Sequence, residues 1–236
     1  ITPASVPVSP AIGELDGEWP REVLYIARYA PREHEDPADY LQYHMAVFAL
    51  RQDPQTYQVE VVWMRQPEWA NPLSNTQLIV QDVDGDGRGD VFGMDWNTIG
   101  HRPGNWEVLG PAHVFRLDWR GNDVWVRELE AYWSNQAIAL TDATGDGKLD
   151  VLANAPGPGG DGLWALDIEN GRSKRFVHAP GWKLLRGPHL TDLHGDGKLY
   201  IAYPGQPEPD VPRGAIILFD MGVPYARDSM ESAWQG

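Results

Sequence analysis

The sequence contains no cysteine. This absence excludes disulfide bonds, thiol catalysis and zinc sites built from cysteine. Histidine is scarce, with 7 residues, and none of them forms a His-x-x-x-His pair for a transition metal. A nucleophile elbow and a phosphate-binding loop are also missing, since the glycine-rich segment 157–160 has no Lys-Ser/Thr after it. The common signatures of hydrolases and nucleotide-binding enzymes are therefore not present.

Long apolar runs and positive charge are lacking as well. No stretch has the length of a membrane-spanning helix, so membrane insertion is not expected. The formal net charge is −15, and nucleic acid is a poor partner because binding to it depends on Lys and Arg. The first residue is Ile1 rather than Met, which is consistent with a leader removed on export. We expect an extracellular or periplasmic protein, where calcium is abundant.

What the chain does contain is a core-forming share of apolar residues and many turn residues. Hydrophobic residues make up 42% of the sequence, which is enough for a folded core. The 25 glycines and 20 prolines are scattered along the chain. Such scatter favours many turns between short strands. The composition therefore predicts a folded all-β protein.

One acidic loop stands out between two short apolar segments. Its positions 1, 3, 5 and 9 carry the carboxylates of Asp82, Asp84, Asp86 and Asp90, with glycine at positions 4 and 6. Calcium takes six to eight oxygen ligands, and alternate residues of a curled loop can converge on one such ion. The carbonyl of Arg88 is a further expected ligand. This loop is predicted to bind Ca²⁺ in a structural role.

The loop recurs along the chain. The second copy offers Asp142, Thr144, Asp146, the carbonyl of Lys148, and Asp150. The third copy offers Asp192, His194 and Asp196, but Tyr200 replaces the closing acid. A weaker copy over residues 14–22 has Trp19 in place of a glycine, and metal binding is not expected there. Repetition at this spacing indicates a repeat fold.

Each loop lies between two strand-like segments and is followed by a hairpin pattern. The predicted hairpin strands are 43–50 with 57–64, 113–117 with 123–127, and 162–166 with 173–177. In each pair, apolar and polar residues alternate on either side of a turn. The repeats begin near residues 14, 82, 142 and 192. This organisation predicts a single domain over 1–236, a β-propeller of four blades with four antiparallel strands each.

The Asp-x-Asp-Gly-Asp-Gly-x-x-Asp-Val pattern resembles the FG-GAP/VCBS repeat. That repeat occurs in the β-propeller of integrin α-chains, in secreted lectins and in propeller domains of exported enzymes. The resemblance implies calcium loops between the first two strands of each blade. The last blade is short of strand-forming residues, so either the extended N-terminal segment 1–10 closes the ring or the chain is an open arc completed by another subunit.

Two further motifs need an interpretation. Arg88-Gly89-Asp90 spells an integrin-recognition tripeptide, but the metal loop already accounts for its glycine and aspartate. Trp63, Trp125 and Trp164 fall in predicted strands and are interpreted as packing residues. Candidate ligand-binding residues on rim loops, where tryptophan stands beside polar side chains, are Trp96, Asn97, His101, Trp106, Trp133 and Asn135.

The sequence thus predicts an exported, calcium-stabilised β-propeller that acts as a binding or structural-assembly module. Its partner would be a protein, another copy of the chain, or a glycan bound through rim loops. One alternative is a lectin-like carbohydrate-binding protein. The other is a polysaccharide-degrading enzyme with its site at the central channel, because the distances between acidic side chains are not known from sequence.

Overall fold

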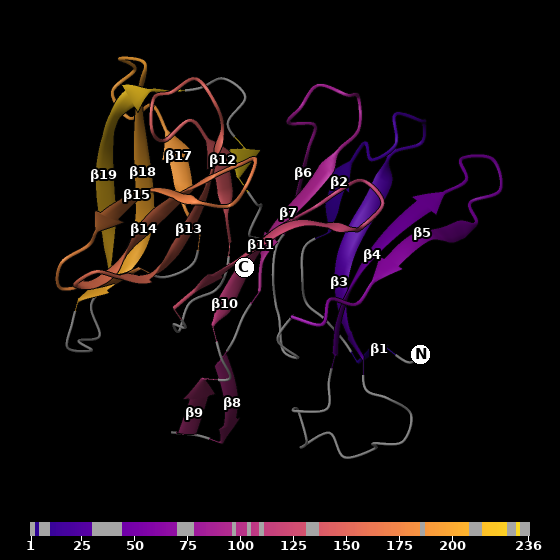
Figure 1. Cartoon of the computed structure of the whole chain (residues 1–236), viewed down its shortest axis with the longest axis horizontal. Helices are drawn as coiled ribbons and strands as arrows, with labels where there is room; N and C mark the ends of the chain where they lie inside the picture. The colour runs from indigo at the N-terminus through magenta and orange to yellow at the C-terminus, as the bar shows by residue number, and fades with distance from the viewer. Residues whose placement is uncertain are drawn as a thin grey trace. The chain divides into compact units, whose positions relative to one another are not determined.

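The computed structural model describes residues 3–4, 10–29, 44–69, 78–95, 98–102, 105–108, 111–130, 137–184, 187–207, 214–225 and 230–231 (Figure 1). The chain divides into two compact units, Ile1–Trp133 and Ser134–Trp234. Each unit is built from antiparallel sheets with a core of its own. The prediction that both units belong to one propeller domain stays a prediction.

The first unit contains two large sheets and a separate hairpin (Figure 1). The first sheet is formed by β2 (Ala11–Gly13), β3 (Glu22–Tyr29), β4 (His44–Gln52) and β5 (Val59–Arg65), with β1 (Pro3–Ala4) also paired to β3. The second sheet is formed by β6 (Ile79–Gln81), β7 (Asp90–Met94), β10 (Ala112–Leu117) and β11 (Asp123–Leu129). The hairpin of β8 (Thr98–Arg102) and β9 (Asn105–Val108) lies between β7 and β10 in the chain.

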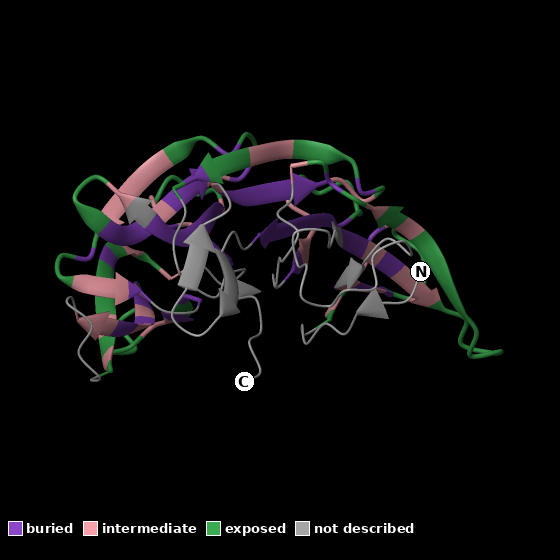
Figure 2. Ribbon diagram, turned by 90° about the horizontal axis from the view of Figure 1, so that it is seen from below, coloured by how far each residue is buried: buried purple, intermediate pink, exposed green. Residues whose placement is uncertain are grey.

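Burial in the first unit falls from the middle strands to the outer strands (Figure 2). All residues of β7 and β10 are buried, whereas most residues of β5 and β11 are exposed or half-buried. The core joins the two sheets through Leu24, Val47 and Phe115, among others. Trp63 on β5 donates its indole Nε1–H to the carbonyl of Trp119, at 2.9 Å. Trp63 also packs against this core, which confirms its predicted packing role.

The second unit repeats this plan with two further sheets. The third sheet is formed by β12 (Ala139–Thr141), β13 (Asp150–Gly157), β14 (Gly160–Asp167) and β15 (Ser173–His178), with β20 (Met230–Glu231) paired to β12. The fourth sheet is formed by β17 (His189–Thr191), β18 (Lys198–Pro207) and β19 (Ala215–Pro224). β16 (Trp182–Leu184) pairs with the end of β18. Trp164 on β14 contacts Phe176, with ring centroids 4.6 Å apart.

The fold class predicted from sequence is confirmed as all-β, with one antiparallel sheet for each of the four repeats. Each acidic loop connects the first two strands of its sheet, and the three predicted hairpins are present as β4–β5, β10–β11 and β14–β15. Within the described residues, the N-terminal segment pairs with the first sheet rather than with the last sheet, where it would have closed the ring. Its strand Pro3–Ala4 pairs with Arg28 and Tyr29 of the first sheet, because β3 extends far enough past β2 to offer a free edge.

Among the described residues there is no helix with the length and apolar character that crossing a bilayer would require.

The core of the second unit contains a buried hydroxyl group without a hydrogen-bond partner. The Tyr203 side chain is fully buried, its Oη has no partner, and burial raises its pKa well above the usual value. A buried hydroxyl without a partner costs about 1 to 3 kcal/mol. We therefore expect Tyr203→Phe to raise the free energy of unfolding by about 1 kcal/mol. Urea denaturation measures this change, and a clearly lower midpoint for the variant would contradict it.

Candidate metal centre

The loop between β6 and β7 is closed by hydrogen bonds from its own backbone. Asp82 accepts from the N–H of Gly85 at 2.8 Å and from the N–H of Gly87 at 2.9 Å. Asp86 accepts from the N–H of Arg88 at 2.8 Å. Gly87 has φ of 84°, a conformation that favours glycine, which explains the glycine at position 6 of the pattern. The first carboxylate thus organises the turn from which the others project.

Three carboxylates of this loop come together. Asp82, Asp84 and Asp86 each place one oxygen within 4.8 Å of the others. Calcium–oxygen distances of about 2.3–2.6 Å allow ligand oxygens to lie up to about 5 Å apart across one ion. The Asp84 side chain is 59% exposed, so an ion can reach the group from solvent. This acidic cluster has the donor type and spacing of a site for a hard cation.

The predicted closing ligand of the loop, Asp90, is engaged by a basic side chain. Arg116 on β10 places its Nη2 at 2.7 Å from Asp90 and 4.0 Å from Asp84. Burial raises the pKa of Asp90, and the hydrogen bond from Arg116 opposes that change. The guanidinium therefore supplies positive charge at the inner end of the loop. The open cluster consists of the other three acids.

The Arg-Gly-Asp tripeptide is part of this framework. The N–H of Gly89 donates to the carbonyl of Leu15 at 3.2 Å, and Asp90 is buried in its ion pair with Arg116. A buried and paired aspartate is not presented to a receptor. The structure agrees with assigning these residues to the loop.

In the second loop a lysine lies where the repeat pattern predicts a metal. The Nζ of Lys174 on β15 is 2.6 Å from Asp146 and 2.7 Å from Asp150. Asp150 also accepts from the N–H of Ala143 and from the N–H and hydroxyl of Thr144. Burial raises the pKa of Asp150, while Lys174 lowers that of Asp146. The carboxylates at positions 5 and 9 thus share one ammonium group.

The remaining predicted ligands of the second and third loops have local partners. Asp142 accepts from the N–H of Gly145 and Gly147, and Asp192 accepts from that of Gly197 in the same way. Asp196 forms an exposed ion pair with Lys198 at 3.3 Å. The His194 ring meets the Tyr200 ring edge-on at 5.2 Å. Within the described ranges, neither loop brings three carboxylates together as the first does.

The loop of the weaker copy, residues 14–22, is also acidic. Glu14, Asp16 and Glu22 each place one oxygen within 4.8 Å of the others. Arg51 on β4 binds both Asp16 and Glu22, and these carboxylates raise the pKa of Arg51. The guanidinium thus pairs with two of the three acids. The expectation that this copy is not a metal site stays a prediction, because these three acids also have the spacing of a metal site.

Sequence reasoning missed the basic partners Arg51, Arg116 and Lys174. They bind the closing acid of three repeats, namely Glu22, Asp90 and Asp150. Each partner follows its acid by 24 to 29 residues, in the hairpin after the loop. The strand that carries this basic residue does not have the same position in its sheet in all three cases. Arg51 and Arg116 lie on the inner strands β4 and β10, whereas Lys174 lies on the outer strand β15. A basic residue in each hairpin was the available signal, but no fixed position marks it.

The candidate rim residues are not tested by the structure. Trp96, Asn97, Trp133 and Asn135 lie outside the described residues. His101 on β8 and Trp106 on β9 are described for their backbone alone. All six remain predictions.

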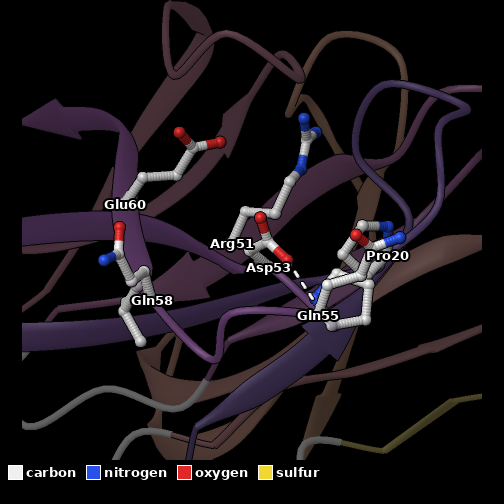
Figure 3. A pocket seen from close by; sticks show the side chains of 8 residues that line it. Pro20, Arg51, Asp53, Gln55, Gln58 and Glu60 are labelled. Atoms are coloured by element: carbon white, nitrogen blue, oxygen red, sulfur yellow. Dashed lines mark hydrogen bonds between the residues drawn. The ribbon is translucent and has the colours of Figure 1, made fainter.

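A pocket of about 490 Å³ lies in the first unit, and none of these candidates is among its lining residues. It lies between the loop over residues 14–22 and the β4–β5 turn (Figure 3). Its lining residues are Pro20, Arg51, Asp53, Pro54, Gln55, Gln58, Val59 and Glu60. Sequence reasoning did not find this pocket, because the first loop was interpreted as a degenerate copy without a site of its own.

No family model matches the chain. The chain is 31% identical over 97 residues to a polyvinylalcohol dehydrogenase of Sphingopyxis sp. (strain 113P3), which covers 39% of this chain and 14% of that protein. The chain therefore spans about a seventh of the length of this relative.

Two solved structures show the same type of β-sheet fold. The rhamnogalacturonan lyase PL11 of Bacillus licheniformis matches with a TM-score of 0.52 and 17% identity, over 82% of this chain and 39% of that one. The exotype rhamnogalacturonan lyase YesX matches with a TM-score of 0.53 and 16% identity, over 85% and 39%. The V. cholerae biofilm matrix protein Bap1 gives a TM-score of 0.37 at 13% identity, over 91% and 34%, which is too low to indicate a common fold. This chain thus has the fold of a part of larger proteins.

Proposed function

We propose that this chain is a non-catalytic binding module of an exported protein, built from propeller-type blades and stabilised by calcium at Asp82, Asp84 and Asp86. The observation that carries the proposal is the clustering of these three carboxylates at one turn. Their turn is held between β6 and β7, so binding an ion there rigidifies the start of a sheet. The ion has a structural role, and function belongs to surfaces that the sheets support.

The comparisons support a role next to hydroxyl-rich polymers. Two proteins of similar fold are named for rhamnogalacturonan, and the relative in sequence is named for poly(vinyl alcohol). Both polymers carry many hydroxyl groups along a chain. A module that binds such a polymer would hold it near a catalytic or assembly partner. Export, calcium binding and closure of the blades into a ring are parts of this proposal.

Calcium is expected to raise the melting temperature of the wild-type chain. At a free calcium concentration of 100 times Kd, ligand binding adds about 2.7 kcal/mol to the free energy of unfolding. Asp84→Asn removes one charge from the exposed edge of the cluster and is expected to lose most of this response. Differential scanning calorimetry with 5 mM CaCl₂ or with EGTA measures the difference.

The matched control is Asp196→Asn in the third loop. That carboxylate is exposed and paired with Lys198 rather than grouped with two other acids. The control should keep the full calcium response. If EGTA and CaCl₂ give the same melting curve for the wild type, calcium has no structural role in this module.

A further inference from the structure

The first repeat differs from the second and third repeats at the place where its loop approaches the following hairpin turn. In the second sheet, the Arg88 guanidinium of the loop lies over the Trp119 ring of the turn, 4.6 Å from its centroid. In the third sheet, Lys148 of the loop forms an ion pair with Glu169 of the turn at 2.7 Å. In the first sheet the corresponding place is the pocket of about 490 Å³ described above. In the first sheet, the pocket thus lies where the second and third sheets have a contact between loop and turn.

Two aromatic residues directly precede residues that line this pocket. They stand at loop and turn positions where the second and third repeats have glycine. Trp19 stands at position 6 of its loop, where the other loops have Gly87, Gly147 and Gly197. It directly precedes Pro20, which lines the pocket. Its side chain is 78% exposed. The flat face of the indole ring is therefore accessible to a ligand.

Tyr57 is the second of these residues, and its backbone is strained. In the third sheet the turn is closed by bonds from Asp167 to Arg172 and from Gly171 to Asp167. The first sheet repeats this pattern from Asp53 to Gln58 and from Tyr57 to Asp53. Tyr57 therefore occupies the place of Gly171 in the third turn.

The conformation confirms this equivalence. Tyr57 has φ of 58° and Gly171 has φ of 69°. A non-glycine residue in this region is disfavoured, and such strain is concentrated at functional sites. The Tyr57 ring is 75% exposed and precedes Gln58, which lines the pocket. The chain thus accepts backbone strain to keep an exposed aromatic ring next to a residue that lines the pocket.

The turn that carries Tyr57 is rigid. The Asp53 carboxylate accepts from the N–H of Gln55 at 2.7 Å and from that of Thr56 at 3.0 Å. On the other side of the pocket, Arg51 ties the Trp19–Pro20 loop to β4 through Asp16 and Glu22. Both walls are therefore fixed before any ligand binds, which lowers the entropic cost of binding.

The lining groups match a ligand with many hydroxyl groups. Gln55 and Gln58 offer amide donors and acceptors, and Asp53 and Glu60 offer carboxylate acceptors (Figure 3). The volume of about 490 Å³ is in the range of small-ligand sites. It is larger than the space that one lysine ammonium group, as in the third sheet, would fill. Two carboxylates in the lining disfavour an anionic ligand. Exposed Trp and Tyr provide flat apolar faces on which a sugar ring can stack.

We propose that this pocket, together with the exposed rings of Trp19 and Tyr57 next to its lining residues in the chain, is a binding site for a neutral saccharide. The inference rests on the proposed function as a binding module and assigns its site and ligand class. Arg51 positions the Trp19–Pro20 wall. The amide and carboxylate groups of the β4–β5 turn bind hydroxyl groups.

Affinity gel electrophoresis of the whole chain tests the proposal. The probes are three soluble neutral polysaccharides (a galactan, a glucan and a mannan), acidic polygalacturonate, and poly(vinyl alcohol). We expect retardation by at least one neutral polysaccharide, and a loss of affinity of at least 10-fold in Trp19→Ala and in Tyr57→Gly. Glu169→Ala, at the equivalent turn of the third sheet, should bind like the wild type.

The Tyr57→Gly variant separates binding from folding. It restores the residue type found at this turn position in the third sheet and removes the backbone strain. Its melting temperature should be equal to that of the wild type or higher, while its affinity falls. A fall in affinity without a fall in stability cannot come from unfolding.

The remaining outcomes distinguish this site from the wider proposal. Wild-type binding that persists unchanged in both variants would overturn the site and leave the binding module in place. Retardation by polygalacturonate or by poly(vinyl alcohol) alone would overturn the neutral-saccharide assignment. No retardation by any polymer would overturn the inference, whereas the calcium response is a separate result that does not depend on it.

Discussion

Lys174→Met is expected to destabilise the chain by about 3 to 5 kcal/mol in calcium-free buffer, the usual cost of removing one partner of a buried ion pair. The Asp150 side chain is 0% exposed, and the Lys174 ammonium lies 2.7 Å from it. Methionine keeps the length of the side chain but leaves the carboxylate without its cation. Urea denaturation followed by tryptophan fluorescence measures the loss.

Two companion variants identify the cause of this loss. Lys174→Met combined with Asp150→Asn removes both charges and should recover a large part of the stability. Lys148→Met breaks an ion pair in which both side chains are 60% exposed, and it should change stability by less than about 0.5 kcal/mol. Equal denaturation midpoints for wild type and Lys174→Met would show that the lysine is not needed.

The same variant tests whether a basic side chain and a calcium ion are alternative ways to neutralise the acidic loops. Lys174 lies between Asp146 and Asp150, two of the residues that the repeat pattern assigns to calcium. Its removal leaves these carboxylates close together and without a cation. Calcium should then stabilise the variant more than it stabilises the wild type. A basic side chain in one repeat and a metal in another can thus hold the same kind of turn.

Much of this fold was predictable because its signals are local. Alternating apolar residues, turn glycines and the acidic pattern of residues 82–90 lie within a few positions of each other. They predicted one sheet for each repeat and the connection of each loop to its first two strands. Hairpins such as β10–β11 follow from the same alternation. The structure confirms these elements within the residues that it describes.

What could not be predicted depends on contacts between distant residues. Arg116 and Lys174 reach equivalent acids from different strands, so no spacing identifies both. The pairing of Pro3–Ala4 with β3 depends on how far β3 extends past β2. The pocket beside Pro20 arises where a loop–turn contact is missing, and a missing contact leaves no motif in the sequence. Trp19 was visible, but only as a departure from the repeat.

Gly89→Ala is the other substitution with a large expected effect, because it alters the packing of two repeat loops in the first unit. A Cβ at this position would lie 2.3 Å from the carbonyl oxygen of Glu14 and 2.6 Å from Val80 Cγ1. The first of these atoms belongs to the backbone and cannot rotate away. We expect a loss of about 3 kcal/mol, at the upper end of overpacking effects. Gly214→Ala, which meets no atom within 4 Å, is the matched control.

The consequences of Gly89→Ala should extend to both proposed sites of the first unit. Gly89 follows the acidic cluster by three residues, and its N–H donates to Leu15 in the loop that carries Trp19 and Pro20. Displacing that loop should weaken both the calcium response and the saccharide affinity, whereas Lys174→Met lies in the other unit and should leave the affinity unchanged. Calorimetry and affinity electrophoresis on the two variants measure these effects. Wild-type affinity in Gly89→Ala, at a temperature where the variant is folded, would show that the pocket does not depend on this loop contact.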